Sequence, residues 1–210
     1  KKNESISEKT IETSIVKEEP IVVSDEIVVD DTKDEKNDSL DDAVYLEDND
    51  RLAPETTSGW ISRVINNSSF GTVKAKSKKT YYIQSAIKIT ASDVVVDFNG
   101  AVLASQGSIP YQFDIENAHN VSLKNIFTAK TETDTGGFLK AKFVTDLTLD
   151  NITGAITGFD TFLDLKGVAR SKFSNINIKN SNGVKKGIGI QMEYCVNIDF
   201  RAIFLEYFII

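Results

Sequence analysis

The sequence predicts an all-β solenoid, in which short strands stack as successive coils behind one helix and a long acidic tail. Two observations carry this prediction. A strand-like motif recurs every 24 to 27 residues, faintly at 93–100 and clearly at 120–126, 146–152, 171–176 and 197–203. A second strand-like run precedes each clear copy, at 113–116, 139–142, 163–166 and 188–191. A unit of this length cannot bury its own apolar face, so neighbouring units must stack.

Residues 1–55 are expected to form a disordered acidic tether, and residues 56–210 the solenoid. The first 50 residues hold 17 Asp and Glu against 6 Lys, a net charge of −11. The other 160 residues hold 14 acidic and 18 basic side chains, a net charge of +4. A segment as polar as the first 50 residues cannot bury enough apolar surface to offset its ordering entropy. An acidic interaction tail is the alternative to a solvated spacer.

A short amphipathic helix is predicted at 60–67, and Ser58 and Gly59 could cap it. Its apolar side chains fall on one side at a spacing of four residues: Trp60, Ile61, Val64 and Ile65. A helix just before a solenoid is well placed to cover the open end of the first coil. Strand-like runs follow the helix at 71–75, 80–83 and 86–89.

Alternate side chains of a strand point to opposite faces, so the second strand of each coil can be sorted into columns. The inward columns are Phe113, Leu139, Leu163 and Ile188, and Ile115, Ala141, Leu165 and Ile190. The outward columns are Asp114, Lys140, Asp164 and Gly189, and Glu116, Lys142, Lys166 and Gln191. Because neighbouring coils lie about 4.8 Å apart, we expect Asp114 and Asp164 roughly 9 to 10 Å apart, with Lys140 between them.

Asparagine forms a further column, which predicts a repeated bend. Its members are 26, 26 and 24 residues apart: Asn99, Asn125, Asn151 and Asn175. Asparagine tolerates the left-handed backbone of a tight bend. Stacked side-chain amides can also hydrogen-bond from coil to coil at a buried turn. We therefore expect a structural role for this column and no role in binding.

Several functional classes find no support in the sequence. Cys195 is the single cysteine, which excludes an intrachain disulfide and indicates a structural thiol. His119 is the single histidine, so neither a Ser-His-Asp triad nor a His/Cys metal cluster can be argued. No apolar stretch approaches the ~20 residues that span a bilayer. The charge of the body is too weak to indicate nucleic acid, but it could attract an acidic polysaccharide.

The order of motifs after residue 57 resembles a known fold. A helix is followed by Gly71-Thr72-Val73, by Tyr81-x-Ile83, by Ile87-Lys88-Ile89 and by the run 94–103. This order is similar to the start of the pectate-lyase-like superfamily, which includes polysaccharide lyases, glycoside hydrolases and phage tailspikes. The resemblance covers about residues 57–207. It implies a right-handed parallel β-helix with an asparagine ladder.

The resemblance also implies a chemistry for the charged columns. Lyases of this superfamily use Lys or Arg to abstract the C5 proton of a uronate, often with carboxylate-bound calcium. The candidate catalytic residues are Lys140, Asp114 and Asp164. The candidate substrate-binding residues are Lys142, Lys166 and Glu116. Opposite charges in neighbouring coils could instead serve only to avoid like-charge repulsion.

An inverting glycosidase is an alternative enzyme class, because its two carboxyl groups lie roughly 6.5 to 9.5 Å apart. Lys140 argues against this class. Its charge between Asp114 and Asp164 would lower the pKa of both carboxyl groups and remove the general acid.

The sequence therefore predicts a secreted or cell-surface protein that binds an acidic polysaccharide and cleaves it by β-elimination, held by its tether or a lipid anchor. The alternative is a non-catalytic glycan-binding β-helix, either a trimeric phage tailspike on a virion or a surface adhesin. Tyr81, Tyr82 and Tyr111 are then candidates for stacking on sugars. The apolar segment 204–210 carries no cap, so we expect a longer chain or a partner to cover it.

Overall fold

The computed structural model describes residues 42–48, 51–52, 55–130, 136–156, 160–180, 187–206 and 208–209. All of them belong to one compact unit that spans residues 40–210. Most of the predicted tether, residues 1–41, lies outside the described residues. Strands dominate the described part, as the sequence predicts for an all-β solenoid.

The strands form two sheets, and every pairing within them is parallel. The long sheet runs in the order β1-β2-β5-β8-β10-β12-β14, with β6 beside β8 and β3 beside β6. Its strands are β1 (Val44–Tyr45), β2 (Thr72–Lys74), β3 (Thr80–Ile83), β5 (Val94–Asp97), β6 (Val102–Ser105), β8 (Val121–Lys130), β10 (Thr148–Ile156), β12 (Ala169–Asn180) and β14 (Val196–Glu206). The short sheet runs in the order β4-β7-β9-β11-β13-β15, with β4 (Ile87–Ile89), β7 (Tyr111–Glu116), β9 (Gly137–Lys142), β11 (Thr161–Lys166), β13 (Gly187–Glu193) and β15 (Phe208–Ile209).

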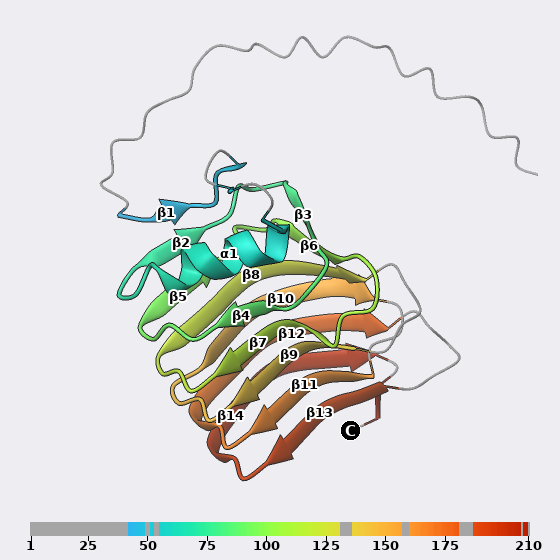
Figure 1. Cartoon of the computed structure of the whole chain (residues 1–210). Helices are drawn as coiled ribbons and strands as arrows, with labels where there is room; N and C mark the ends of the chain where they lie inside the picture. Colours follow the sequence, from blue (N-terminus) through green and yellow to red (C-terminus); the bar gives the residue numbers. More distant parts are fainter. Residues whose placement is uncertain are drawn as a thin grey trace, which may run out of the picture. The chain divides into compact units, whose positions relative to one another are not determined.

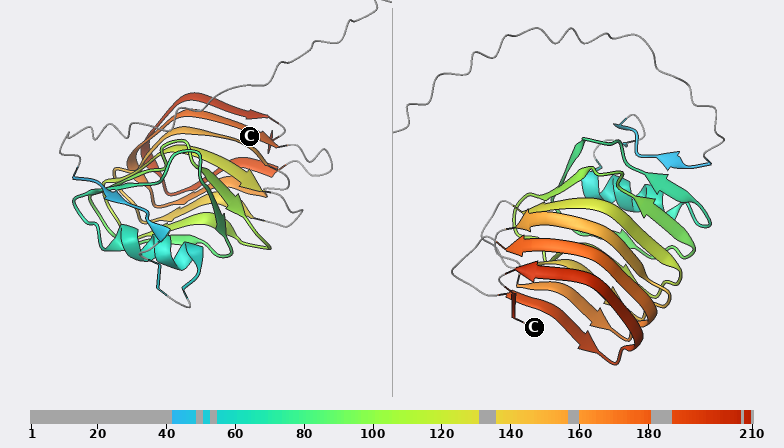
Figure 2. Two further views of the ribbon diagram at one scale, coloured as in Figure 1. Left: turned by 90° about the horizontal axis from the view of Figure 1, so that it is seen from above. Right: turned by 180° about the vertical axis from the view of Figure 1, so that it is seen from behind.

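The chain winds through the two sheets in turn, so each coil adds one rung to both. Figure 1 shows the rungs of the short sheet stacked beneath the helix, and Figure 2 shows the same stacking of the long sheet from behind. The successive coils are β7 with β8, β9 with β10, β11 with β12, and β13 with β14. This arrangement is the parallel β-helix that the repeat predicts.

The register of the short sheet confirms most of the predicted columns and corrects the last coil. Asp114 pairs with Lys140, and Lys140 pairs with Asp164. In the last coil, however, Leu163 pairs with Ile190 and not with Ile188, so the predicted alignment of β13 is wrong by two residues. A two-residue slip keeps every inward residue inward, and alternation alone therefore cannot detect it. Ile188 pairs instead with Thr161, and its side chain is 43% exposed.

A stack of aromatic rings, all buried except the partly buried Phe208, runs through the core from the helix to the last coil. Neighbouring ring centroids are 5.2 to 6.2 Å apart along Trp60, Tyr81, Phe98, Phe113, Phe138, Phe162 and Phe208. Such pairs stabilise beyond the area they bury. Because Tyr81 is fully buried in this stack, it is excluded as a sugar-stacking residue.

The predicted helix forms, but it begins earlier than expected. It is α1 (Thr57–Asn66), and its N-cap is Thr56, whose hydroxyl accepts a hydrogen bond from the amide of Gly59 at 3.1 Å. The expected cap at Ser58 and Gly59 is thus wrong, because both residues lie within the first turn. The four predicted apolar side chains of α1 are buried, and α1 lies over the first coil at the top of Figure 1.

The asparagine column marks a bend, as predicted, but its hydrogen bonds form only part of a ladder. All four asparagines have left-handed backbones, with φ between 51° and 57°. The Asn151 amide donates to Asn125 at 2.8 Å, whereas Asn125 donates to Asp97 and Asn175 donates to Asp150. The column is partly or fully exposed and not buried, so water can also solvate it. Its role remains structural.

The two ends of the described unit differ in cover. At the first end, β1 pairs with β2 and Leu46 is buried, although residues 42–48 fall within the predicted tether. At the other end, the side chains of β14 are only partly buried, and Phe204 is 66% exposed. In the described part of the chain, no helix is long and apolar enough to cross a membrane.

Candidate functional site

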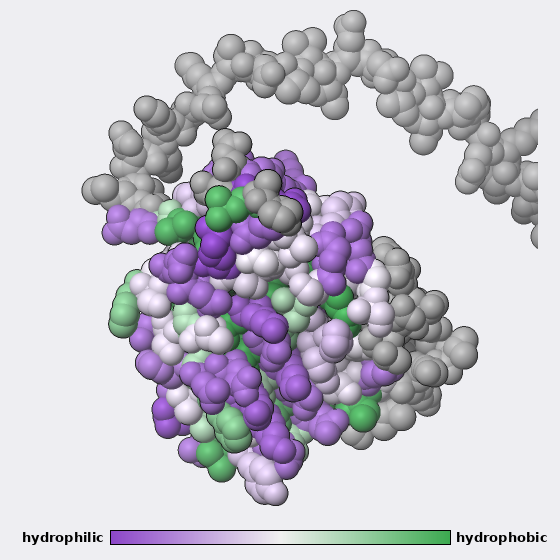
Figure 3. Space-filling view, viewed as in Figure 1, coloured by the Kyte–Doolittle hydropathy of each residue, from purple (hydrophilic) through white to green (hydrophobic). Residues whose placement is uncertain are grey.

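The outer face of the short sheet carries the polar side chains that could perform chemistry. Figure 3 shows hydrophilic side chains running down this face over the stacked rungs. The register sorts them into two lines that cross the coils. We call Lys88, Asp114, Lys140 and Asp164 the open column. We call Glu116, Lys142, Lys166 and Glu193 the paired column.

Ion pairs within the paired column compensate its charges. The Lys142 ammonium lies 2.9 Å from the Glu116 carboxylate, and the Lys166 ammonium lies 2.8 Å from Glu193. Hydrogen bonding from Lys142, together with its charge, holds the pKa of Glu116 below its usual value. Lys142 also lies 5.3 Å from the ring centroid of Phe143. The predicted substrate-binding role of Lys142, Lys166 and Glu116 stays a prediction, but a ligand would have to displace these partners.

The open column differs, since none of its members forms an ion pair with any residue that the structure describes. Lys88 and Lys140 flank Asp114 along the column. Asp164 accepts a hydrogen bond at 3.1 Å from the hydroxyl of Tyr111. The predicted catalytic residues Lys140, Asp114 and Asp164 therefore lie together, with two cations whose charges are available to a ligand.

A hollow lies beside the open column and has the size of a ligand site. This lysine hollow has a volume of ≈ 410 Å³, and its lining includes Lys88, Asp114, Lys140 and Tyr111. A second hollow of ≈ 280 Å³ is lined by Tyr111, Asp160, Thr161, Gly136, Ser108 and Pro110. We call it the aspartate hollow. Because Ser108, Pro110 and Tyr111 line both, the two hollows adjoin and form one groove with Tyr111 between its halves.

Gly137 explains how Tyr111 reaches Asp164 across an intervening coil. The two residues pair in the register of β7 and β9. A Cβ atom at position 137 would collide with the ring of Tyr111 and with the carbonyl oxygen of Thr161. A residue without a side chain therefore leaves the space in which the Tyr111 ring crosses β9.

The Tyr111 phenol keeps its proton in this setting and so remains a hydrogen-bond donor. Burial, the charge of Asp164 and the hydrogen bond to Asp164 together raise the pKa of Tyr111 to about 12, with smaller effects of Asp160 and Asp114. The sequence suggested Tyr111 only as a stacking residue. The sequence signal for this contact is Gly137, the first residue of β9, because a residue without a side chain leaves room for a ring from the neighbouring strand.

The side chains of this groove do not match a calcium site. Calcium takes six to eight oxygen ligands from several carboxylates and carbonyls. In the open column Lys140 separates Asp114 from Asp164, and Asp164 is engaged by Tyr111. Across the residues that the structure describes, no three Asp, Glu, His or Cys side chains gather as a metal site.

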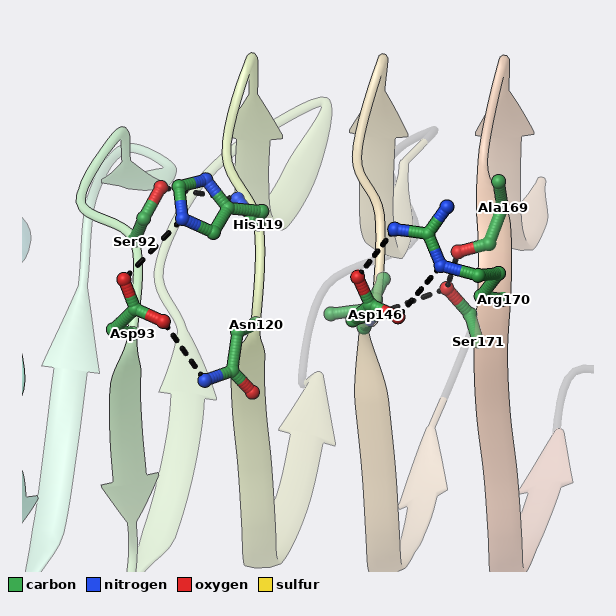
Figure 4. A network of polar contacts seen from close by, with 9 residues as sticks. Ser92, Asp93, His119, Asn120, Asp146, Ala169, Arg170 and Ser171 are labelled. Atoms are coloured by element: carbon green, nitrogen blue, oxygen red, sulfur yellow. Dashed lines mark hydrogen bonds and ion pairs between the residues drawn. The ribbon is translucent and has the colours of Figure 1, made fainter.

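A second polar network lies at the turns that lead into the long sheet (Figure 4). His119 Nε2 lies 3.3 Å from Asp93, which also accepts a hydrogen bond from Asn120 at 2.9 Å. Arg170 binds Asp146 through two nitrogen atoms at 2.7 and 3.0 Å, and this hydrogen bonding lowers the pKa of Asp146. Each partner bridges to the next coil. The network therefore ties exposed turns together, and we assign it a structural role.

Comparisons with known proteins found similarity only at the level of structure. No family model matches it, and no curated protein matches it. Among solved structures, it is similar to the crystal structure of a "putative glycosyl hydrolase" from Parabacteroides merdae. The two share 11% identity with a TM-score of 0.46, over 72% of this chain and 89% of the other. A likeness this distant transfers no activity, so function has to be argued from the groove.

Proposed function

We propose that the protein is an extracellular carbohydrate-active protein that binds an acidic polysaccharide in the groove of the short sheet. The observation that carries this proposal is the pair Lys88 and Lys140, two cations without ion-pair partners among the described residues, which line a hollow of ≈ 410 Å³. Lysine is a mobile point charge that suits the carboxylate of a uronic acid. The expected ligand is therefore a sugar chain with carboxylates.

The shape of the site favours a glycan chain over a small ligand. The coils repeat about every 4.8 Å, which is comparable to the length of one sugar residue in an extended glycan. The groove runs past several coils and offers both acceptors and donors, including Asp114, Ser108 and the hydroxyl of Tyr111. Sugar hydroxyl groups need such mixed partners. A glycan lying across the rungs would meet a new set of partners at each coil.

Cleavage by β-elimination is the reaction that these residues could support. Lys88 would hold the uronate carboxylate as the cation, and Lys140 would act as the base, giving its own proton to solvent before it takes the C5 proton of the bound uronate. The electron pair of that C–H bond would form the C4–C5 double bond, and the bond from C4 to the glycosidic oxygen would break. The leaving oxygen would take a proton from solvent, because the Tyr111 proton is held in its hydrogen bond to Asp164. Asp114 lies between the two lysines in the register of the strands.

The test combines binding and product formation. Purified protein is titrated calorimetrically with soluble oligouronates and, in parallel, the ultraviolet absorbance of unsaturated uronate products is followed. We expect binding that falls about tenfold in Lys140→Ala, through the loss of one charge-assisted contact to a ligand carboxylate, and little change in the control Lys142→Ala. A rise in absorbance that Lys140→Ala abolishes would support β-elimination.

The outcomes separate the enzyme from its alternative. Binding without product would make the protein a glycan-binding module of the adhesin type, with the same groove as its site. If no acidic glycan binds, or if Lys142→Ala weakens binding as much as Lys140→Ala does, the groove is not the binding site and the proposed function is wrong.

A further inference from the structure

The two halves of the groove differ in charge. The lysine hollow holds Lys88 and Lys140 against Asp114, an excess of positive charge among its described side chains. The aspartate hollow contains Asp160 as its one charged described residue. Asp160 is exposed and forms no ion pair with the described residues. One half therefore attracts a carboxylate and the other half repels one.

The contacts at Tyr111 sharpen this difference. Its hydroxyl donates to Asp164, and the ring stands between the two hollows because Gly137 leaves space for it. Asp164 binds the Tyr111 hydroxyl, Asp160 lines the aspartate hollow with Tyr111, and Asp114 lines the lysine hollow with Tyr111. A second carboxylate on the ligand, bound past Tyr111, would thus meet Asp160 with no described cation to neutralise it.

We infer that the groove selects a glycan in which an acidic sugar alternates with a neutral or amino sugar, and that it discriminates against a chain made only of uronic acids. The acidic sugar occupies the lysine hollow, and its uncharged or cationic neighbour occupies the aspartate hollow. This inference rests on the proposed function. It goes further by assigning Asp160 as the residue that determines specificity through repulsion.

Net charge alone would predict the opposite order of affinity for the two kinds of glycan. A chain composed only of uronic acids carries twice as many carboxylates as an alternating chain of the same length. If the groove acted as a general cationic surface, the more charged chain would bind more tightly. The inference requires the reverse order, so the ranking of two ligands decides it.

The experiment compares hexasaccharides by calorimetry at fixed ionic strength. The alternating probes are hexasaccharides of hyaluronan and of unsulfated chondroitin, and the uniform probe is a hexasaccharide of polygalacturonate. We expect an alternating probe to bind at least about tenfold more tightly, because like-charge juxtaposition is strongly unfavourable. Asp160→Asn should raise the affinity for the uniform probe about two- to fivefold, the range that one exposed charge contributes. Asp42→Asn, an exposed residue of the region before α1, is the charge-matched control and should change nothing.

The possible outcomes distinguish a failure of the alternating-glycan preference from a failure of acidic-glycan binding. If the uniform probe binds as tightly as both alternating probes and Asp160→Asn has no effect, the alternation is wrong, while acidic-glycan binding stands. If Asp42→Asn has the same effect as Asp160→Asn, the change reflects net charge and the role of Asp160 is wrong. If none of the probes binds, the inference and the proposed function both fail.

Discussion

The open column and the paired column lie on the same face of the same sheet, two residues apart along each strand, and yet they differ in what their charges do. In the paired column, Glu116 with Lys142 and Lys166 with Glu193 neutralise one another. In the open column, Lys88 and Lys140 keep their charges for the solvent or a ligand. The difference teaches that alternating charge on a solenoid face does not by itself identify a site. Whether a charged column can bind a ligand depends on the residues that lie beside it.

The neighbours of the open column come from outside the repeat. Tyr111 begins β7 and reaches over Gly137, and Ser108 and Pro110, which lie between β6 and β7, line both hollows. The paired column instead lies next to the tight turns at which Phe143 and Gly167 adopt left-handed backbones. Irregular segments around a regular scaffold thus create the groove, as is common for binding sites.

The largest expected effect comes from filling the space under Tyr111. Gly137→Ala places a Cβ against the Tyr111 ring and the Thr161 carbonyl, so the ring or a strand must move. Overpacking of this kind costs about 1–3 kcal/mol, and thermal unfolding should show a lower Tm with weaker binding of acidic glycans. Tyr111→Ala in the same background should recover part of the stability. If Gly137→Ala is as stable as the wild type, the groove is not held in the described way.

Alkaline titration probes the open column through Tyr111. Because its pKa in the folded protein is raised to about 12, the unfolded chain loses this proton first, near pH 10. The stabilising contribution is therefore complete below about pH 10 and is lost as the pH rises towards 12. Denaturant unfolding should show this alkaline loss in the wild type and a smaller one in Tyr111→Phe. Identical pH profiles for the two proteins would contradict the partly buried, carboxylate-bound phenol.

Acid titration probes the paired column and should give the smallest effect. Its hydrogen bond and ion pair with Lys142 lower the pKa of Glu116 in the folded protein. The contribution of Glu116 is therefore present above its unfolded pKa, about 4.3, and is lost as the pH falls through the lowered value. Wild type should exceed Glu116→Gln slightly in stability at neutral pH, with the difference vanishing in acid. A difference that grows on acidification would refute the pairing.

The regular part of the molecule could be predicted from the sequence because it repeats. Apolar alternation at Phe113 and Ile115, repeated in three later coils, is enough to predict the coil, its inward columns and the neighbours of Lys140. The period of two that makes this possible also hides a shift by two residues, which is why the alignment of Ile188 and Ile190 with β11 was wrong.

The groove could be predicted only in part, because it depends on contacts that do not repeat. Lys140, Asp114 and Asp164 followed from the column, but Lys88 was missed as its first member, since β4 precedes the clear repeats. The hydrogen bond from Tyr111 to Asp164 joins residues 53 positions apart and two coils distant. No local pattern marks such a pair. The pairing within the second column also depended on the corrected register that brings Glu193 beside Lys166.

The most direct test of the central claim removes the same charge from each column. The double variants Lys88→Ala/Lys140→Ala and Lys142→Ala/Lys166→Ala each delete two lysines from the same face of the short sheet. Calorimetric titration with one acidic oligosaccharide compares them. The account predicts that the first double variant loses binding and that the second keeps affinity close to that of the wild type. Equal loss in both variants would contradict it, because the ligand would then be held by the net charge of the face and not by the open column.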